Sequence, residues 1–439
     1  MSSSSSPTRR AARVPQSNRE TLAARADRLG RLAAVRPGLV DRLARRLVLG
    51  LLDHVSEGEL RVVEGDFTRR AGSRSPRFPE TIEVRVLSPR FYRAIAFGGT
   101  VGSGESFMAE EWQCSDLAGL IRLILANGSL RGQLEGGTAR LVEPLRRALH
   151  AMRRNVRRAS RRNIAAHYDL GNDFFELFLD PTMAYSSGVF ARPDMSMQAA
   201  SVEKFERICK SIDLREGDHL LEIGTGWGGF AIHAARTRGC RVTTTTISRA
   251  QHDWAARWIR EEGLEGRIEL LLEDYRDLEG QYDKIVSIEM IEAVGHQYFP
   301  TFFQVVNDRL VSHGRAAIQA IVIDDDAYER ATRTVDFIKQ YIFPGGCLPS
   351  LRVMDEITRS QTELALSERE DITAHYAETL RRWRSRLEDN AHRILERGYP
   401  ERLLRMWEFY LCYCEAGFEE RTIGTYQLVF EKNGPVPGG

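Results

Sequence analysis

A glycine-rich turn between an apolar run and a helical run is the feature that most constrains this chain. Residues 219–230 have the sequence HLLEIGTGWGGF, in which Gly224, Gly226 and Gly228 follow a short hydrophobic strand. Glycine lets a ligand approach the backbone without meeting a Cβ atom, and the helix N-terminus behind the turn favours an anionic group. The spacing G-x-G-x-G differs from the G-x-G-x-x-G of dinucleotide sites. With Glu222 in front, it favours a nucleotide-like ligand without a pyrophosphate, such as S-adenosylmethionine (SAM), although a tight ligand-free loop would contain the same glycines.

Strand and helix patterns alternate around this turn. The predicted strands are 219–223, 240–246, 267–272, 282–288 and 315–323, and the predicted helices are 200–213, 229–238, 248–262 and 300–310. Such alternation predicts an α/β fold, a doubly wound and mostly parallel sheet that binds its ligand at the carboxyl ends of the strands. Thr246 and Gln251 follow the second strand, within reach of ribose hydroxyls. Asp274 and Tyr275 follow the third strand, where they can flank an adenine ring.

A second, smaller domain is expected before this one. With 439 residues, 42% of them hydrophobic and 28% charged, the chain is long enough for two globular domains. We predict a disordered tail at 1–20 and a small α/β domain at 21–130, with helices over 20–60 and 105–130 and short strands over 60–100. The larger domain is predicted at 163–435. No apolar stretch reaches about 18 residues, and the six cysteines lack C-x-x-C spacing. We therefore expect a cytoplasmic protein with neither a spanning helix nor a metal site.

The segment that joins the two predicted domains, 131–162, is strongly basic. Nine arginines lie between Arg140 and Arg162, with Glu143 as the only acidic residue. Leucines at helical spacing predict an amphipathic basic helix that lies on anionic phospholipid, where each basic residue contributes about 1 kcal/mol. A solvated linker helix is the alternative. Nucleic acid is not expected as a partner, because no aromatic residues are interleaved to stack on bases. Peripheral association with the inner face of the membrane is expected, and a homodimer is left open.

Nine motifs, in order along the chain, resemble those of the cyclopropane fatty acid synthase family, which includes the mycolic acid synthases. They are residues 166–175, 183–190, 222–231, 245–251, 271–278, 289–299, 337–350, 375–383 and 407–418. Residues 98–112, GGTVGSGESFMAEEW, are similar to the lipid-associated N-terminal domain of that family. The resemblance implies a class I SAM-dependent methyltransferase that acts on unsaturated acyl chains of phospholipids.

The resemblance also implies roles for individual residues. Tyr185, Ser186 and the three glycines of the turn would hold the methionine part of SAM. Thr246 and Gln251 would contact the ribose, and Asp274 and Tyr275 would flank the adenine. A cysteine once given an active-site role in the family matches Cys414, for which a packing role is the alternative.

In many family members a bound bicarbonate ion acts as the base, held by a cysteine, a glutamate, a histidine, a backbone group and a tyrosine. The glutamate, backbone group and tyrosine match Glu292, Ile321 and Tyr376. The cysteine and histidine positions carry Ser187 and Gln319, which can donate hydrogen bonds but cannot titrate near neutral pH. These replacements leave open whether bicarbonate binds here. The alternative is that Glu292 itself acts as the base.

The expected reaction adds the methyl carbon of SAM to an acyl double bond and then removes a proton, giving a cyclopropane. The same transfer ending in a methylene or methyl-branched chain is the first alternative, and a degenerate lipid-binding protein is the second. Methylation of a soluble metabolite or of RNA is the third. Aromatic rings would stabilise the positive charge on the acyl chain, each by about 0.5–2 kcal/mol. The candidates are Tyr275, Tyr298, Phe299, Tyr341, Phe343 and Tyr376.

Overall fold

Five neighbouring parallel strands make up most of a seven-stranded sheet in the larger domain. The structure is a computed structural model that describes residues 37–128 and 170–433. The parallel strands are β5 His219–Ile223, β6 Arg241–Thr245, β7 Ile268–Leu271, β8 Tyr282–Ile288 and β9 Leu310–Ile323. The strand order is β10-β11-β9-β8-β5-β6-β7, so the chain changes direction across the sheet between β7 and β8. The carboxyl ends of β5 and β8 therefore meet at a topological switch point, where sheets of this kind bind ligands.

Helices connect the parallel strands, as the alternating pattern predicts. They are α9 Met197–Ser211, α10 Gly229–Arg238, α11 Arg249–Glu261 and α12 Phe299–Arg309. Strands such as β5 are buried almost throughout, because helices cover both faces of the sheet. The predicted α/β class with a mostly parallel sheet is confirmed. The predicted strand bounds lie within two residues of the observed ones, except that β9 begins five residues earlier than expected.

An antiparallel pair completes the sheet and was not predicted from the sequence. It consists of β10 Leu364–Asp371 and β11 Ile423–Lys432, and β11 pairs with β9 from Ile423 opposite Ile323 to Glu431 opposite Arg315. The edge strand β10 has the sequence LALSERED, whose charged half hides the alternation expected of a strand. The remaining helices of the larger domain are α8 Asn172–Phe175, α13 Asp325–Arg333, α14 Leu351–Gln361, α15 Thr373–Asp389, α16 Ala391–Glu396 and α17 Glu401–Glu419.

The smaller domain is a four-stranded sheet packed with three helices. Its strands are β1 Gly58–Glu64, β2 Phe67–Ser73, β3 Thr81–Val86 and β4 Trp112–Cys114, in the order β2-β1-β3-β4. Its helices are α2 Leu39–Leu51, α3 Arg90–Met108 and α4 Leu117–Ala126. The glycine-rich segment at 98–104 lies inside α3, with a kink at Gly99, where φ is 54°. The expectation of strands up to residue 100 was therefore wrong for 90–100, because tertiary packing holds this glycine-rich sequence in a helix.

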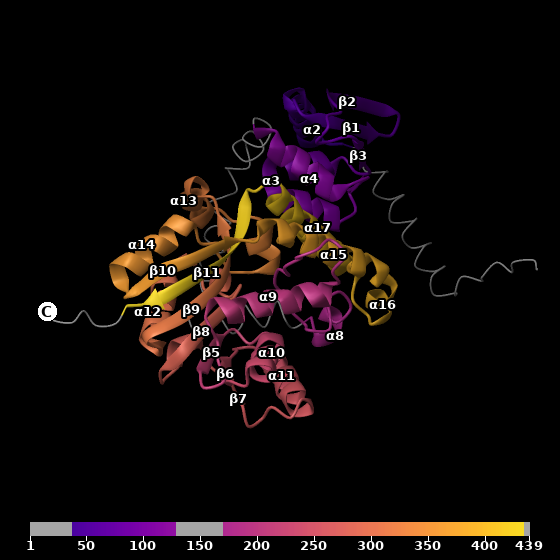
Figure 1. Ribbon diagram of the computed structural model, residues 1–439. Helices are drawn as coiled ribbons and strands as arrows, with labels where there is room; N and C mark the ends of the chain where they lie inside the picture. The colour runs from indigo at the N-terminus through magenta and orange to yellow at the C-terminus, as the bar shows by residue number, and fades with distance from the viewer. Residues whose placement is uncertain (1–36, 129–169, 434–439) are drawn as a thin grey trace, which may run out of the picture.

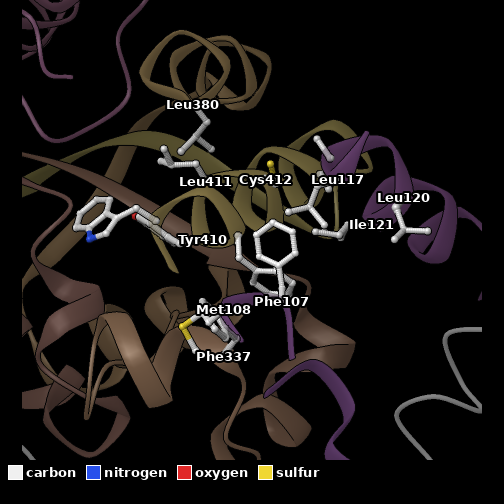
Figure 2. Packing of buried hydrophobic residues seen from close by; sticks show 14 of the residues in the cluster. Phe107, Met108, Leu117, Leu120, Ile121, Phe337, Leu380, Tyr410, Leu411 and Cys412 are labelled. Atoms are coloured by element: carbon white, nitrogen blue, oxygen red, sulfur yellow. The ribbon is translucent and has the colours of Figure 1, made fainter. Parts of the chain in front are cut away.

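Helix α17 joins the two domains through an apolar interface. In Figure 1 the smaller domain lies at one end of the molecule, over α15 and α17. Figure 2 shows Phe107 and Ile121 of the smaller domain beside Leu411 of α17 and Phe337 of the larger domain, all in one buried cluster. The rings of Phe107 and Phe409 lie 5.8 Å apart between centroids. The two domains thus share a continuous hydrophobic core.

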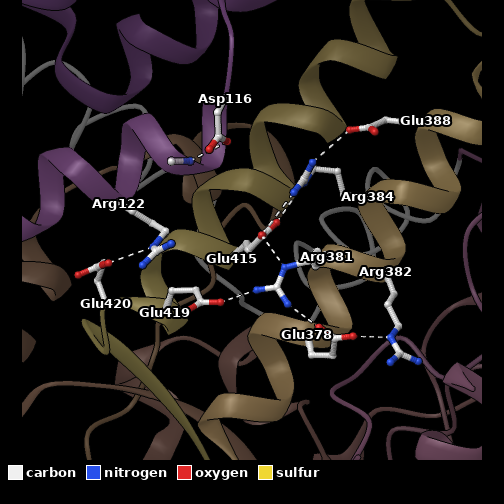
Figure 3. Close-up of polar contacts among 11 residues, drawn as sticks. Asp116, Arg122, Glu378, Arg381, Arg382, Arg384, Glu388, Glu415, Glu419 and Glu420 are labelled. Carbon is white, nitrogen blue, oxygen red and sulfur yellow. Dashed lines mark hydrogen bonds and ion pairs between the residues drawn. The ribbon is translucent and has the colours of Figure 1, made fainter. Parts of the chain in front are cut away.

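Ion pairs surround this interface. Arg122 of α4 contacts the buried carboxylate of Glu420 at 3.1 Å, just beyond the end of α17. Within the larger domain, Arg381 and Arg384 of α15 pair with Glu415 of α17 (Figure 3). These contacts fix α17 between α4 on one side and α15 on the other.

Over the ranges 37–128 and 170–433, no helix is long and apolar enough to cross a membrane. The predicted tail at 1–20 and the basic helix at 131–162 lie outside the described residues. The two sheets fall within the predicted domains, at 58–114 and 219–432. The exact domain bounds, 21–130 and 163–435, stay predictions.

Candidate functional site

A large cavity extends from the carboxyl ends of the parallel strands into the smaller domain. Its volume is about 1570 Å³, whereas a single small ligand typically occupies a pocket of roughly 300–1,000 Å³. At the sheet end it is lined by Glu222, Gly224, Gly226, Thr246, Gln251 and Asp274. At the far end it is lined by apolar side chains of the smaller domain, namely Val48, Leu52, Val62, Val84, Leu120 and Ile124. The cavity thus has a polar end and an apolar end, with room for two ligands.

The glycine turn after β5 forms part of the polar end. Gly224, Gly226 and Gly228 have φ values of 105°, 53° and 98°, all in the region that favours glycine. A Cβ atom on Gly229 would lie 2.3 Å from the carbonyl oxygen of Thr182, whereas one on Gly226 would have no heavy atom within 4 Å. Gly226 therefore faces open space, where a ligand can approach the backbone closely.

Glu222, Thr246 and Gln251 lie beside the turn, where the ribose was expected. Glu222, at the end of β5, accepts a hydrogen bond from Thr244 Oγ1 at 2.5 Å, and burial raises the pKa of its carboxyl to about 8. Thr246 Oγ1 donates to Gln251 Oε1 at 3.0 Å. This contact leaves the Gln251 amide group as a donor, and all three side chains line the cavity. The structure therefore brings the predicted ribose contacts together.

Asp274 and Tyr275 lie after β7, where adenine contacts were expected. The Asp274 carboxylate is paired with Arg276 at 2.6 Å, so its role in the structure is to fix this loop. The Tyr275 hydroxyl is buried and has no hydrogen-bond partner among the described residues, and burial raises the pKa of that hydroxyl. The phenol ring lines the cavity. An unpaired buried hydroxyl is costly without a ligand, so this loop suits a bound polar group.

Tyr185 and Ser186 connect the cofactor end to the centre of the cavity. The Tyr185 hydroxyl lies 3.0 Å from that of Tyr410, and Ser186 Oγ accepts a hydrogen bond from the fully buried Lys204. Burial lowers the pKa of the Lys204 ammonium to about 8, while the charges of Glu289 and Asp180 oppose that shift. The sequence did not single out Lys204, because one lysine in the polar pattern of α9 gives no sign of burial.

The predicted catalytic residues Ser187, Gln319 and Tyr376 surround a carboxylate that the sequence did not single out, that of Glu289. Glu289 Oε1 accepts from the Ser187 backbone N–H at 2.9 Å and from Gln319 Nε2 at 2.7 Å. Glu289 Oε2 accepts from the Tyr376 hydroxyl at 2.6 Å. Glu289 follows β8 directly and has a φ of 50°, a conformation that non-glycine residues rarely adopt. Glu289 belongs to the motif EMIEAVG and could have been found from it, but the sequence-based prediction chose Glu292 of the same motif.

Glu292 lies one short turn further on, in η4 Ile291–Ala293. Its Oε1 accepts from the backbone N–H of Ile321, so these two residues, both expected to hold a bicarbonate ion, bind each other directly. Its Oε2 is buried and has no hydrogen-bond partner within the part of the chain that the structure describes. Burial, with a further contribution from the charge of Glu289, raises the pKa of Glu292 to about 8. At neutral pH Glu292 is therefore mostly protonated, beside the hydrogen-bonded Glu289.

Cys414 lines the same cavity, on α17. Burial raises the pKa of its thiol well above the ordinary value, so it stays a thiol at neutral pH. The surroundings thus match a packing cysteine better than a nucleophile.

Only some of the predicted rings face the cavity. Tyr275, Phe343 and Tyr376 line it. The expectation was wrong for Tyr298, Phe299 and Tyr341, which are not among its lining residues. The Tyr341 hydroxyl instead donates to Glu105 of α3 at 2.6 Å, across the domain interface. Further rings from α17 and the glycine turn line the cavity where none was predicted, namely Trp227, Phe409, Tyr410, Tyr413 and Phe418.

Comparison with known proteins identifies relatives along most of the chain. The family of mycolic acid cyclopropane synthetases matches residues 155–428. A tuberculostearic acid methyltransferase, UfaA1, of Mycobacterium tuberculosis is 37% identical over 417 residues, which cover 92% of this chain and 94% of that protein. A cyclopropane-fatty-acyl-phospholipid synthase of Escherichia coli is 34% identical over 80% of this chain and 88% of that protein.

A solved structure shares both the fold and the sequence pattern of the larger domain. The crystal structure of mycolic acid cyclopropane synthase CmaA1, complexed with SAH and CTAB, aligns with a TM-score of 0.59 and 29% identity. The alignment covers 62% of this chain and 98% of that chain. The glycine turn, the buried carboxyl of Glu222 and the unpaired hydroxyl of Tyr275 provide, in this chain, a site that fits SAM.

Proposed function

The chain belongs to the mycolic acid cyclopropane synthetase family and is a SAM-dependent methyltransferase, and we propose that it methylates the double bond of unsaturated phospholipid acyl chains and forms a cyclopropane. The observation that carries this proposal is the continuous cavity. Its polar end has the residues suited to SAM, and its apolar end is lined by the smaller domain. A soluble polar substrate would have no need of that apolar end.

The residues of the polar end hold and orient the cofactor. The turn at Gly224 and Gly226 takes the methionine part together with Tyr185 and Ser186, whereas Gly228, expected to join them, faces Ala255 and does not line the cavity. Thr246 and Gln251 bind the ribose, and Tyr275 flanks the adenine. When bound, SAM supplies an electrophilic methyl group. Positioning of this kind can lower a barrier by about 7–11 kcal/mol.

The centre of the cavity stabilises the acyl chain while it carries positive charge. The rings of Tyr185, Phe343 and Tyr376 line this part of the cavity. Each aromatic face contributes about 0.5–2 kcal/mol to binding a cation, more where water is excluded. The carboxylate of Glu289, which lines the cavity nearby, adds an acceptor for the proton that must leave.

A phospholipid membrane is the proposed source of the acyl chain. Helix α2 exposes an apolar stripe of Leu39, Leu43 and Leu47, with exposed fractions of 79%, 57% and 44%, beside Arg42 and Arg46. This combination suits an anionic bilayer surface. Residues Val48 and Leu51 of the same helix line the cavity, so the stripe and the apolar end of the cavity belong to one element. The basic segment at 131–162 would add to the attraction.

A methylene or methyl-branched product is the second candidate. It is favoured by the 37% identity to a protein named a tuberculostearic acid methyltransferase, which spans nearly the whole chain. The cyclopropane and the methylene product arise from the same methylated chain and differ in which proton is removed, whereas a methyl branch also requires reduction of the methylene by a separate reductase. The position of the base relative to the acyl chain thus decides between them.

Mass spectrometry of lipids tests the proposal directly. The purified protein is incubated with labelled SAM and vesicles of monounsaturated anionic phospholipid, and the lipids are analysed for ring, methylene and methyl products. A labelled cyclopropane lipid is the expected result. A labelled methylene lipid would support the second candidate. Calorimetry that finds no SAM binding would instead point to a degenerate lipid-binding protein.

A further inference from the structure

Glu289 is held in place by three donors that converge on its carboxylate. The Ser187 N–H and Gln319 Nε2 both donate to Oε1, and the Tyr376 hydroxyl donates to Oε2. A carboxylate oxygen has two lone-pair sites, so one site on Oε2 remains after the bond from Tyr376. Glu289 and Tyr376 line the cavity, whereas Ser187 and Gln319 are buried behind them. The carboxylate is thus supported from behind and faces the site of reaction.

Each donor is itself fixed. Gln319 Oε1 accepts from Gln427 Nε2 at 3.0 Å, and this orients the Gln319 amide with its Nε2 toward Glu289. The Tyr376 ring stacks on Phe418, with centroids 4.3 Å apart and an interplanar angle of 11°. A strand, a helix and the loop that contains Ser187 therefore fix one carboxylate, an arrangement typical of a preorganised functional group.

The backbone at Glu289 is strained as well. A φ of 50° in a non-glycine residue is unfavourable, and such strain clusters at functional sites. The Glu289 N–H donates to the Gln319 carbonyl oxygen at 2.8 Å, so the strained residue is tied to β9 by its backbone as well as by its side chain.

The surrounding charges suit a base that works near neutral pH. Burial raises the pKa of Glu289, while the Tyr376 hydrogen bond, the Lys204 charge and the Ser187 and Gln319 bonds favour its ionised form. The neighbouring Glu292 holds its proton up to about pH 8, so Glu289 is the ionised member of the pair. A carboxylate with a raised pKa is a stronger base than an exposed one.

We propose that the Glu289 carboxylate is the catalytic base of this enzyme, which takes the place of any bound carbonate ion; this rests on the proposed function. The acyl chain gains a carbon–carbon bond to the transferred methyl as the methyl–sulfur bond breaks, and its other alkene carbon becomes positively charged. Glu289 Oε2 then removes a proton. The electron pair of that C–H bond closes the ring if the proton leaves the new methyl, or forms an alkene if it leaves the neighbouring chain carbon. The proton stays on Glu289 until it passes to water.

The donors that the resemblance assigned to a bicarbonate ion are already in use. The Ser187 hydroxyl donates to the Gly188 carbonyl oxygen, and its backbone N–H donates to Glu289. Gln319 and Tyr376 also bind Glu289, and the Ile321 N–H binds Glu292. We therefore expect turnover of the unmodified protein to be the same in buffers depleted of carbon dioxide and in buffers with added bicarbonate.

Substitution of Glu289 provides the first test. Glu289→Gln keeps the shape and removes the base, and turnover on vesicles should fall about 100-fold or more, since general bases contribute 10²–10⁴-fold. SAM affinity by calorimetry and the melting temperature should stay close to those of the matched surface variant Glu368→Gln, an exposed residue of β10. Turnover of Glu289→Gln within threefold of the Glu368→Gln value would overturn the proposal.

Chemical rescue provides the second test and separates a base from a structural residue. Glu289→Gly removes the carboxylate and suits the positive φ, so the backbone is relieved rather than strained. Formate or bicarbonate added to this variant should restore turnover at least tenfold, whereas neither should change the Glu368→Gln control. Absence of rescue by both anions, in a variant that still binds SAM, would contradict the proposal.

A spectroscopic titration keeps the test independent of turnover. The infrared carboxylate band that disappears in Glu289→Gln should titrate above the ordinary range of a glutamate in the ligand-free protein. A band that titrates in the ordinary range would overturn the proposal even if the enzyme is active. If the unmodified protein does not methylate any vesicle lipid, the proposed function fails, and this titration alone decides whether Glu289 has the properties of a base.

Discussion

The Tyr376 hydroxyl donates a 2.6 Å hydrogen bond to Glu289 Oε2 and so joins helix α15 to the carboxyl end of strand β8. The bond crosses from the C-terminal part of the chain to the central sheet. It places a phenol and a carboxylate together on the wall of one cavity. Its consequences can be measured through the pH dependence of the reaction.

We expect Tyr376→Phe to reduce turnover about tenfold and to shift the acidic limb of the pH profile upward. The hydroxyl favours the ionised form of Glu289, so its removal raises the pKa of Glu289 further. The active, ionised form is then lost at a higher pH as the solution is acidified. The other titratable groups that interact with this carboxylate are Lys204 of α9, Glu292 of η4 and Tyr410 of α17. Turnover measured against pH tests the shift, and an unmoved acidic limb would contradict it.

Glu292→Gln should make protein stability less dependent on pH. The folded protein keeps the Glu292 proton up to about pH 8, whereas the unfolded chain releases it near pH 4.5. Between these values the folded state binds more protons, so the free energy of unfolding falls as pH rises, by about 1.4 kcal/mol per pH unit for one group. Glu222 contributes in the same direction, because its pKa is also raised to about 8.

Urea unfolding at several pH values between 5 and 8 measures this slope. The slope should be shallower in Glu292→Gln than in the unmodified protein. The surface variant Glu368→Gln should leave it unchanged. An equal slope in all three proteins would mean that Glu292 does not retain its proton.

Gly226→Ala should weaken SAM binding at least tenfold, with only a modest loss of stability in the ligand-free protein. A Cβ atom here meets no protein atom within 4 Å, and the remaining cost is the backbone strain of alanine at a φ of 53°, about 1–2 kcal/mol. The methyl group would therefore project into the space for the ligand. Calorimetry with SAM measures the loss. By contrast, Gly229→Ala should lower the melting temperature, because its Cβ meets the Thr182 carbonyl oxygen at 2.3 Å.

Replacement of Leu39 and Leu43 by Gln should weaken binding to anionic vesicles at least fivefold. Both leucines are exposed on α2, and transfer of a leucine side chain out of water contributes about 1.5–3 kcal/mol when burial is complete. The matched control is Leu366→Gln, an exposed leucine on β10, on a different part of the molecule from α2 (Figure 1). Sedimentation with vesicles compares the three proteins. Equal sedimentation of all three would exclude the α2 stripe as the membrane contact.

The sequence predicted the parallel part of the fold well, because strands such as β5 are buried on both faces and have short apolar runs that alternate with helical patterns. It did not predict β10, whose edge position permits the charged sequence SERED. It also predicted the wrong structure for the first half of α3. Taken alone, the glycines of that segment are typical of turns. Only the folded structure shows why small residues are needed there, because a Cβ atom on Gly104 would overlap the Phe337 ring.

The sequence predicted several residues of the candidate site but not the residue at its centre. Ser187, Gln319 and Tyr376 were named from the motifs, yet the group that brings them together is Glu289. Lys204 was missed for a related reason. Burial decides the chemistry of both residues, and burial of a single charged side chain leaves no periodic signal in the sequence.

The position of β11 has a consequence for how the protein is made. This strand contains residues 423–432, near the end of the chain, yet it lies between β9 and β10 inside the sheet. A ribosome that has released only the first 400 residues thus presents β9 with an unsatisfied edge, open to other nascent chains. We expect the sheet to close only after residues 423–432 have left the ribosome.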